Sequence, residues 1–315
     1  MREQDLLRHI FARSSGLSAA YPHLHVGPGD DCAVIASPAG SSLLLKVDQL
    51  VEGRHFRPFP ATPVELIARK AIARAASDIA AMGGTPLCAL AAATLPNPCP
   101  WADELFDHMA RWARHWQCPL VGGDIASWGR TEGSERRKDE VTASGGLVLS
   151  VTVIGTPHAA RGPVLRSTAR AGDGVYVTGP LGGSLDAATG LGRHLTFEPR
   201  LAEARTLCDT LGAGLHAMMD VSDGLGIDAG RLAVASGVRI EIDAAAIPRA
   251  PGAMHWLRAS SDGEDYELLF AAAPTGPPVP PFCTRIGRVV AGTGCVIIEN
   301  GREIDATGLG WDHAR

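Results

Sequence analysis

Glycine and proline divide this sequence into apolar segments of two lengths that alternate along the chain. Short runs such as 87–95 have the length of strands. The longer segment 63–82 is rich in Ala, Ile and Arg, and it contains no helix-breaking residue until Gly83-Gly84. Because this alternation continues over almost the whole chain, it predicts an α/β protein in which helices cover the faces of sheets.

The expected elements follow from this pattern. In the first half we expect a short amphipathic helix at about 3–13, a hairpin of strands 32–36 and 43–47, helices 63–82 and 101–116, and strands 87–95, 119–121 and 146–155. In the second half we expect strands 175–178, 217–220, 238–242, 267–271, 284–289 and 295–299, with helices near 186–191, at 199–211 and from Ser222-Asp223.

The length of 315 residues is about twice that of a typical domain, so we expect two domains. The Pro-, Gly- and Arg-containing segment 156–173 has the composition of a linker. It divides the chain into an N-terminal domain at 1–155 and a C-terminal domain at 156–315. The segment 130–140 carries charges of both signs without periodicity, which favours an exposed loop over a nucleic-acid patch.

Charge and cysteine content exclude several classes of protein. With 29 basic and 34 acidic residues the net charge is −5, so no overall basic field would attract nucleic acid or an anionic membrane. The longest uncharged run, between Asp78 and Asp103, is interrupted by glycines and prolines, and we expect no membrane span. The charged N-terminus does not resemble a secretory signal. Seven cysteines without a C-x-x-C pair indicate reduced thiols and a cytoplasmic protein.

Acidic residues beside glycines or at the ends of apolar runs are the main candidates for a functional site. The ends of strands in α/β proteins face the crevice where ligands bind. Asp78 differs, because it lies within a predicted helix among apolar neighbours, where an unpaired carboxylate would be costly. The other candidates are Asp30, Asp31, Asp48, Asp124, Asp220 and Asp223.

Carboxylates that converge on one place repel each other unless cations neutralise them. An all-oxygen ligand set suits Mg²⁺, Mn²⁺ or Ca²⁺. Taken singly, however, Asp223-Gly224 is better explained as a turn or helix cap. The Gly-rich segment Gly179–Ser184 could bind a phosphate through its backbone N–H groups, but an ordinary strand-to-helix turn explains it at least as well.

An ordered set of six segments resembles the thiamine-monophosphate kinases, a family within the aminoimidazole ribonucleotide synthetase-like superfamily. Two of the segments, Val47–Phe56 and Gly263–Leu268, separate this family from its superfamily relatives. The resemblance extends from about residue 2 to Trp311-Asp312. The remaining segments are Gly29–Val34, Arg69–Gly83, Gly122-Gly123-Asp124 and Asp220–Leu225.

The resemblance implies two α/β domains with mixed sheets and flanking helices, an N-terminal domain that forms a homodimer, and ATP-dependent phosphorylation of thiamine monophosphate to thiamine diphosphate. The acceptor is an anionic phosphate, so a direct in-line transfer assisted by several Mg²⁺ ions needs no general base. By similarity, the metal ligands are Asp31, Asp48, Asp78, Asp124, Asp220 and Asp223. The ATP-binding residues are Gly123, Asp124, Arg166 and Ser222, and the substrate-binding residues are His55, Glu264 and Trp311.

The sequence departs from the family pattern at a few positions. Lys46-Val47 replaces small hydroxyl residues before Asp48, and Ala75 and Ile125 replace the usual Asn and Thr. Lys46 could take the place of a metal ion, contact a phosphate, or point away from the site. Two other functions therefore stay open: an ATP-using enzyme of the same superfamily with a different small phosphorylated substrate, and a homologue that binds ATP without turning it over.

Overall fold

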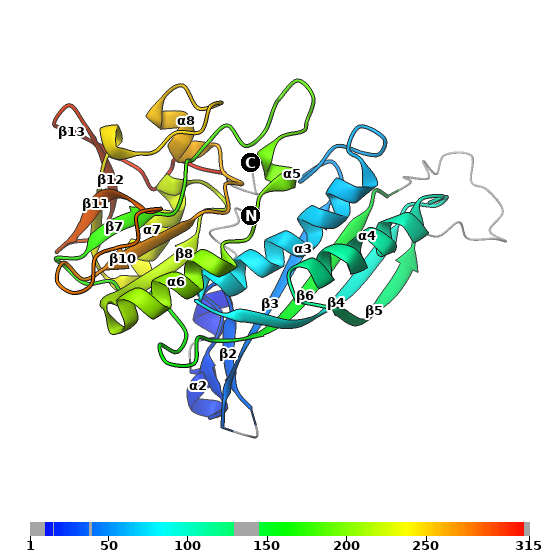
Figure 1. Cartoon of the computed structure of the whole chain (residues 1–315), viewed down its shortest axis with the longest axis horizontal. Coiled ribbons are helices and arrows are strands. Elements are labelled where there is room, and N and C mark those ends of the chain that lie inside the picture. Colours follow the sequence, from blue (N-terminus) through cyan, green and yellow to red (C-terminus); the bar gives the residue numbers. More distant parts are fainter. Residues whose placement is uncertain (1–9, 15, 38–39, 129–144, 312–315) are drawn as a thin grey trace.

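The structure is a computed structural model, and it describes residues 10–14, 16–37, 40–128 and 145–311. Figure 1 shows two sheets with helices packed against them. Both sheets contain parallel and antiparallel strands, which confirms the mixed α/β fold expected from the sequence. Of the predicted N-terminal helix, the described positions 10–14 are helical. The charged segment 130–140 lies outside the described residues.

The first sheet has six strands in the order β1-β2-β3-β6-β4-β5. The expected hairpin is confirmed, because β2 and β3 pair in antiparallel register. Alternate residues of β6, among them Leu149, Val151 and Val153, are buried, so one face of the sheet lies against the core. The strands are β1 (Leu24–Val26), β2 (Ala33–Ala36), β3 (Ser42–Val51), β4 (Thr85–Leu95), β5 (Leu120–Ser127) and β6 (Val148–Thr156).

Helices α3 (Val64–Ala81) and α4 (Ala102–His115) cover this buried face (Figure 1). On α4, buried residues recur at every fourth position, at Leu105, Met109 and Ala113, as expected for an amphipathic helix. Nearly all of α3 is buried, and it ends where Gly83 adopts a positive φ of 68°. Asp78 therefore lies in the last turn of a central helix.

The second sheet has seven strands in the order β13-β12-β9-β11-β7-β10-β8. Its helices are α6 (Leu201–Leu211), α7 (Leu225–Ser236) and α8 (Trp256–Ser261). The strands are β7 (Gly174–Val177), β8 (Leu215–Asp220), β9 (Arg239–Asp243), β10 (Leu268–Ala272), β11 (Thr284–Val290), β12 (Gly294–Glu299) and β13 (Arg302–Asp305).

The last turn of α3 also packs against the second sheet. Ala80 and Ala81 belong to a buried cluster with Met218 of β8 and Phe270 of β10. The first sheet ends at Thr156 and the second begins at Gly174, and the predicted domain division at 155/156 stays a prediction. Because both sheets meet at this end of α3, Asp78 lies next to elements from both halves of the chain.

Several sequence predictions were wrong in detail. Residues 186–191 form turns and not a helix, because Gly190 and Gly192 have positive φ values, and the next helix is α5 (Arg193–Thr196). Helix α7 begins at Leu225 and not at Ser222. Strand β5 continues through 122–124, where it was expected to end. The short elements α2 (Leu17–Ala20), α8, β1 and β13 were not predicted.

No helix in the described ranges is long and apolar enough to cross a membrane.

Candidate active site

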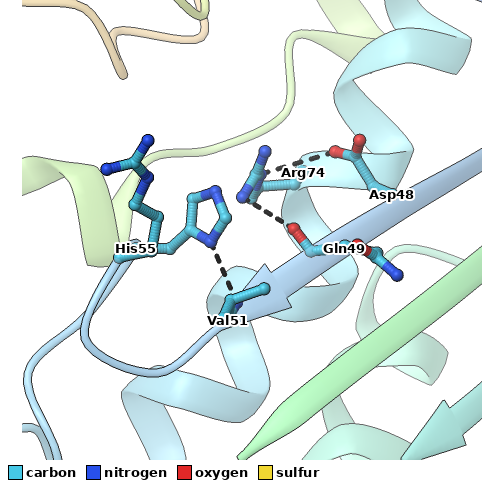
Figure 2. Close-up of a pocket in the computed structure, with 6 residues that line it drawn as sticks. Asp48, Gln49, Val51, His55 and Arg74 are labelled. Atoms are coloured by element: carbon cyan, nitrogen blue, oxygen red, sulfur yellow. Dashed lines mark hydrogen bonds and ion pairs between the residues drawn. The ribbon is translucent and has the colours of Figure 1, made fainter. Parts of the chain in front are cut away.

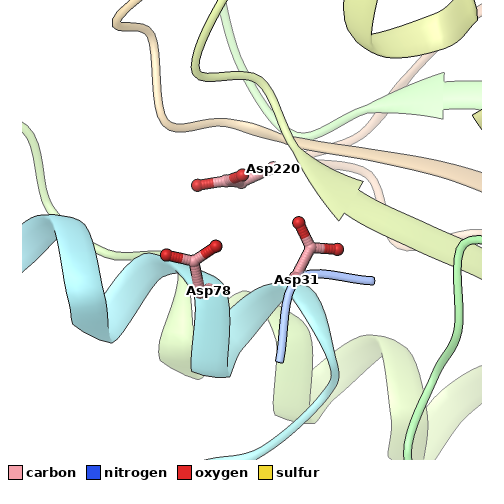
Figure 3. A group of neighbouring side chains, drawn as sticks. All are labelled: Asp31, Asp78 and Asp220. Atoms are coloured by element: carbon pink, nitrogen blue, oxygen red, sulfur yellow. The ribbon is translucent and has the colours of Figure 1, made fainter. Parts of the chain in front are cut away.

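Three buried aspartates from distant parts of the sequence meet where the two sheets join. Asp31 follows β1, Asp78 lies on α3 and Asp220 ends β8. Their side chains point toward one another (Figure 3), and one carboxylate oxygen from each lies within 4.8 Å of the other two. Their residues are no more than 6% exposed. We call these three residues the aspartate trio.

Basic side chains surround the trio. Arg166 Nη2 lies 2.5 Å from Asp31 Oδ1, and the backbone N–H of Arg166 donates to Asp30 Oδ2 over 3.1 Å. Lys46 Nζ lies 2.8 Å from Asp78 Oδ1 and 3.6 Å from Asp48 Oδ1. The structure therefore places Asp30, Lys46 and Arg166 beside the trio. The side chain of Lys46 points into the site.

Lys46 and Asp48 reach the site because they alternate with exposed residues along β3. Side chains two positions apart in a strand share one face. Lys46, Asp48 and the buried Leu50 face α3, while Val47 lies on the opposite face and is 59% exposed. Asp48 also contacts Arg74 of α3, with 3.4 Å between Oδ2 and Nε.

The acids of the site are not fully neutralised by these cations. Burial, strengthened by the charge of Asp31, raises the pKa of Asp220 to about 7. Burial also raises the pKa of Asp78 well above its usual value, although Lys46 opposes this shift. The pKa of Asp30 is raised to about 6 by burial and by Asp31. Deprotonation of Asp78 and Asp220 is thus costly unless further positive charge arrives.

The trio fits a hard divalent cation. Its donors are all carboxylate oxygens, the ligand type that Mg²⁺ and Ca²⁺ prefer. No donor among the described residues reaches Asp31 Oδ2, although this atom is buried. A buried carboxylate oxygen without a donor, close to two further carboxylates, is what a cation would satisfy.

A cavity of about 490 Å³ is lined by Asp48, which is linked to Asp78 of the trio through Lys46. Figure 2 shows three of its lining residues, with the Arg74 side chain between the His55 ring and Asp48. The His55 ring is fixed, because its Nδ1 accepts a hydrogen bond of 2.9 Å from the backbone N–H of Val51. The remaining lining residues are Gln49, Val51 and Arg54. The volume is that of a site for a small molecule.

Lys70 joins two of the predicted substrate residues. Its fully buried ammonium donates to the carbonyl oxygen of His55 over 2.8 Å and to Glu264 Oε2 over 2.7 Å, and it lies 2.9 Å from His194 Nδ1. Burial would raise the pKa of Glu264, but Lys70 and His194 lower it to about 2. Burial lowers the pKa of Lys70 to about 8. Lys70 and Glu264 are therefore both charged near neutral pH.

Trp311, the third predicted substrate residue, lies near the same loop. The guanidinium carbon of Arg54, which lines the cavity, lies 5.2 Å from the centre of the Trp311 ring. The backbone N–H of Trp311 donates to the carbonyl oxygen of Asp223 over 2.7 Å. The structure thus brings His55, Glu264 and Trp311 to one end of the site.

The segment 222–224 is held by a carboxylate that the sequence prediction missed. Asp228 Oδ2 accepts the backbone N–H groups of Ser222, Asp223 and Gly224 over 3.0–3.1 Å. Arg231 Nη1 lies 2.5 Å from Asp223 Oδ2 and 2.8 Å from Asp228 Oδ1. Ser222 and Asp223 therefore lie in a fixed loop after Asp220, with the Asp223 charge already paired.

Gly123 and Asp124 are not brought to the trio. Both lie on β5, the outer strand of the first sheet, and Asp124 is exposed. The strand register pairs Asp124 with Ala92 of β4, in a row that continues through β6 to Gln49, on the face of the sheet opposite Asp48. Gly123 is required where it stands, because a Cβ there would lie 1.9 Å from the carbonyl oxygen of Ala91.

The Gly-rich turn Gly179–Ser184 is held by acids of the protein itself. The backbone N–H of Gly182 donates to Asp265 Oδ1, and that of Gly183 donates to Asp262 Oδ2, each over 2.9 Å. These two N–H groups already have carboxyl oxygens of the protein as acceptors, which favours the structural explanation of the segment over phosphate binding.

The sequence of α3 contained a signal for some of the site residues that the prediction missed. Lys70, Arg74 and Asp78 are spaced by four residues, so they lie along one side of a helix that is otherwise rich in Ala and Ile. Polar residues repeated at this spacing on a buried helix mark a functional face. His194, Asp228 and Arg231 had no comparable sequence signal.

Comparisons with known proteins agree with this architecture. A family model for the N-terminal domain of AIR synthase related proteins matches residues 29–156. The thiamine-monophosphate kinase of Rhodopirellula baltica is 35% identical over 93% of this chain and 90% of its own length. That of Mycobacterium tuberculosis is 35% identical over 87% of this chain and 82% of its own.

A solved structure of AaThiL complexed with AMPPCP and TMP superposes with a TM-score of 0.74 at 28% identity, and the match covers 99% of each chain. The relatives and the fold agree over nearly the whole length. This chain therefore belongs to the thiamine-monophosphate kinase family, and it is a kinase with the two-sheet α/β fold of that family.

Proposed function

We propose that this kinase transfers the γ-phosphoryl group of ATP directly to thiamine monophosphate, yielding thiamine diphosphate and ADP. A new bond forms between a phosphate oxygen of thiamine monophosphate and the γ-phosphorus, and the bond from that phosphorus to the β–γ bridging oxygen breaks. The observation that carries the proposal is the buried aspartate trio, which Lys46 links to Asp48 at the wall of a cavity of ligand size. AaThiL, with the same fold, was solved with AMPPCP and TMP, which correspond to an ATP analogue and thiamine monophosphate.

Asp31, Asp78 and Asp220 are the proposed principal ligands of Mg²⁺. Bound Mg²⁺ would offset the negative charge of the two phosphate-bearing substrates so that they can approach in line. Arg166 adds a permanent positive charge at Asp31, and a guanidinium suits phosphate oxygens. The acceptor oxygen is already anionic, so no side chain has to remove a proton from it.

The remaining assignments rest on family resemblance and on position. We propose that His55, Glu264 and Trp311 bind thiamine monophosphate, since Lys70 and Arg54 hold them around one end of the site. Metal-binding roles for Asp48, Asp124 and Asp223 are also proposals, as are contacts of Gly123, Asp124, Arg166 and Ser222 with ATP.

We also propose a homodimer formed through the uncovered face of the first sheet. Val47 and Leu90 both lie opposite Thr152 of β6, so they form one row across three strands. They are 59% and 40% exposed, and helices α3 and α4 cover the other face (Figure 1). A second copy of the chain would bury this apolar row. A cytoplasmic location and the domain division at 155/156 complete the proposal.

The proposal is tested by measuring ADP release by the purified full chain with ATP and Mg²⁺, with and without thiamine monophosphate. We expect release that depends on thiamine monophosphate. Binding of ATP without such turnover would favour the non-catalytic alternative, and turnover that requires another small phosphate would favour a different superfamily substrate. Either result would contradict the proposed function.

A further inference from the structure

Lys46 occupies a position in the site where a cation is needed. Its ammonium lies between two carboxylates, 2.8 Å from Asp78 Oδ1 and 3.6 Å from Asp48 Oδ1. Lys46 and Asp48 come from β3, and Asp78 comes from α3, so the ammonium connects a strand and a helix. A divalent ion that bridged Asp48 and Asp78 would have to occupy the same space.

Two basic side chains of the protein flank Asp48. Lys46 Nζ lies 3.6 Å from Oδ1. On the other side of Asp48, Arg74 Nε lies 3.4 Å from Oδ2. Asp48 therefore has a basic partner from the protein at each of its two carboxylate oxygens.

The trio is less completely paired, although Arg166 contacts Asp31 and Lys46 contacts Asp78. Asp31 Oδ2 is buried, and no described residue donates to it. Asp220 accepts a hydrogen bond of 2.6 Å from the uncharged hydroxyl of Ser77. The two regions of the site differ: Asp48 is satisfied by the chain itself, while the trio retains a need for positive charge.

We propose that Lys46 replaces one divalent cation of this site. The ammonium neutralises charge at Asp48 and Asp78 in place of an ion, and divalent ions bind at Asp31, Asp78 and Asp220. The idea deepens the proposed function and rests on it for the presence of bound Mg²⁺. It also revises the role of Asp48, which becomes a partner of Lys46 and Arg74 and ceases to be a metal ligand.

The test counts bound Mn²⁺ per chain by calorimetry and by electron paramagnetic resonance, in the full chain with an ATP analogue and without thiamine monophosphate. Lys46→Ser should bind about one additional Mn²⁺ per chain, because the freed carboxylates and the hydroxyl form an oxygen site. Lys46→Arg should keep the wild-type count. Arg114→Ser, which removes one positive charge from the exposed surface of α4, serves as the control and should also keep it.

A second variant makes the test independent of how well Lys46→Ser folds. Asp48→Asn should leave the Mn²⁺ count of the wild-type background unchanged, because Asp48 does not hold an ion there. An equal count in Lys46→Ser and wild type would overturn the proposal, and so would a lower count in Asp48→Asn. Since ions are counted without thiamine monophosphate, failure of the proposed kinase reaction would appear in the ADP assay and not in this one.

Discussion

The hydroxyl of Ser77 donates a hydrogen bond of 2.6 Å to Asp220 Oδ2. Ser77 lies on α3, which covers the first sheet, and Asp220 ends β8 of the second sheet. Both residues are almost completely buried. This bond therefore joins the two halves of the chain at the aspartate trio. Because Ser77 directly precedes Asp78, the bond also holds the proposed metal ligands Asp78 and Asp220 near each other.

Removal of this hydroxyl is expected to destabilise the fold. Ser77→Ala leaves a buried carboxylate oxygen without its donor, and we expect a loss of about 1–3 kcal/mol in the free energy of unfolding, measured by urea denaturation. Ser260→Ala is the matched control, because the buried Ser260 hydroxyl bonds within its own helix, to the carbonyl oxygen of Trp256. Equal losses in the two variants would contradict the special role of the Ser77 contact.

The raised pKa of Asp220 predicts a pH dependence of stability. The native pKa is about 7 and the ordinary value is 3.8, so the native state binds more protons than the unfolded state between these values. The stabilising contribution of protonation is complete below pH 3.8, and it is lost as the pH rises through 7. Asp220→Asn stays neutral throughout this range, so its stability should fall less than that of the wild type.

The measurement is the free energy of unfolding from pH 5 to pH 8 in metal-free buffer. We expect the difference between Asp220→Asn and wild type to shift by roughly 1–4 kcal/mol in favour of the variant as the pH rises. Asp107→Asn, an exposed substitution on α4, controls for the change of residue type. Parallel pH profiles for wild type and Asp220→Asn would show that the buried carboxylate does not hold its proton.

Loss of a trio carboxylate should abolish the reaction. Asp78→Asn removes an anionic oxygen ligand from the trio, and we expect a fall in kcat of at least about 100-fold with an unchanged far-ultraviolet circular dichroism spectrum. Asp107→Asn should retain wild-type activity. Asp124→Asn is tested in the same assay. The structure places Asp124 on β5, away from the trio. A fall in kcat comparable to that of Asp78→Asn would therefore mean that Asp124 contributes to the reaction from outside the trio.

Lys70 should act on substrate binding by positioning Glu264 and the loop at His55. Lys70→Met removes the hydrogen bonds to Glu264 and to the His55 carbonyl oxygen. We expect the KM for thiamine monophosphate to rise about tenfold, with less than about a twofold change in the KM for ATP. Lys70→Arg should restore part of the difference. An equal rise in both KM values would indicate general damage to the fold and no positioning role.

The proposed dimer face gives a prediction for the oligomeric state. Leu90→Glu places a charge in the apolar row on the uncovered face of the first sheet, so we expect a shift from dimer to monomer in size-exclusion chromatography with light scattering. Val234→Glu is the matched control, because Val234 is 72% exposed on α7 of the second half. A dimer that persists in Leu90→Glu but dissociates in Val234→Glu would place the interface elsewhere.

The sequence pattern anticipated the elements of this fold better than it anticipated their ends. The long helix α3 was predicted from 63 to 82 and spans Val64–Ala81, because its apolar content and the Gly83-Gly84 stop are local features. Strand β5 was expected to end before Gly122, yet it continues through Asp124, since pairing with β4 outweighs the low strand propensity of glycine.

The sequence predicted the acidic character of the site, but it predicted only some of the residues that form it. Asp78 was identified because a carboxylate among apolar neighbours is energetically costly without a partner. The structure supports this local argument, since Lys46 is paired with Asp78. The partners of Glu264 and Asp223, namely Lys70 and Arg231, were missed. Lys70 and Glu264 are 194 residues apart in the sequence. Contacts of this kind follow from how the two sheets pack against each other, and one sequence contains no local signal for that packing.

The central claim is direct phosphoryl transfer to thiamine monophosphate, and the most direct test is to quantify thiamine diphosphate and ADP together by chromatography and mass spectrometry. The full chain is incubated with ATP, Mg²⁺ and thiamine monophosphate. We predict that the two products appear in equal amounts, and that Asp78→Asn forms neither. ADP that accumulates without thiamine diphosphate would contradict the claim.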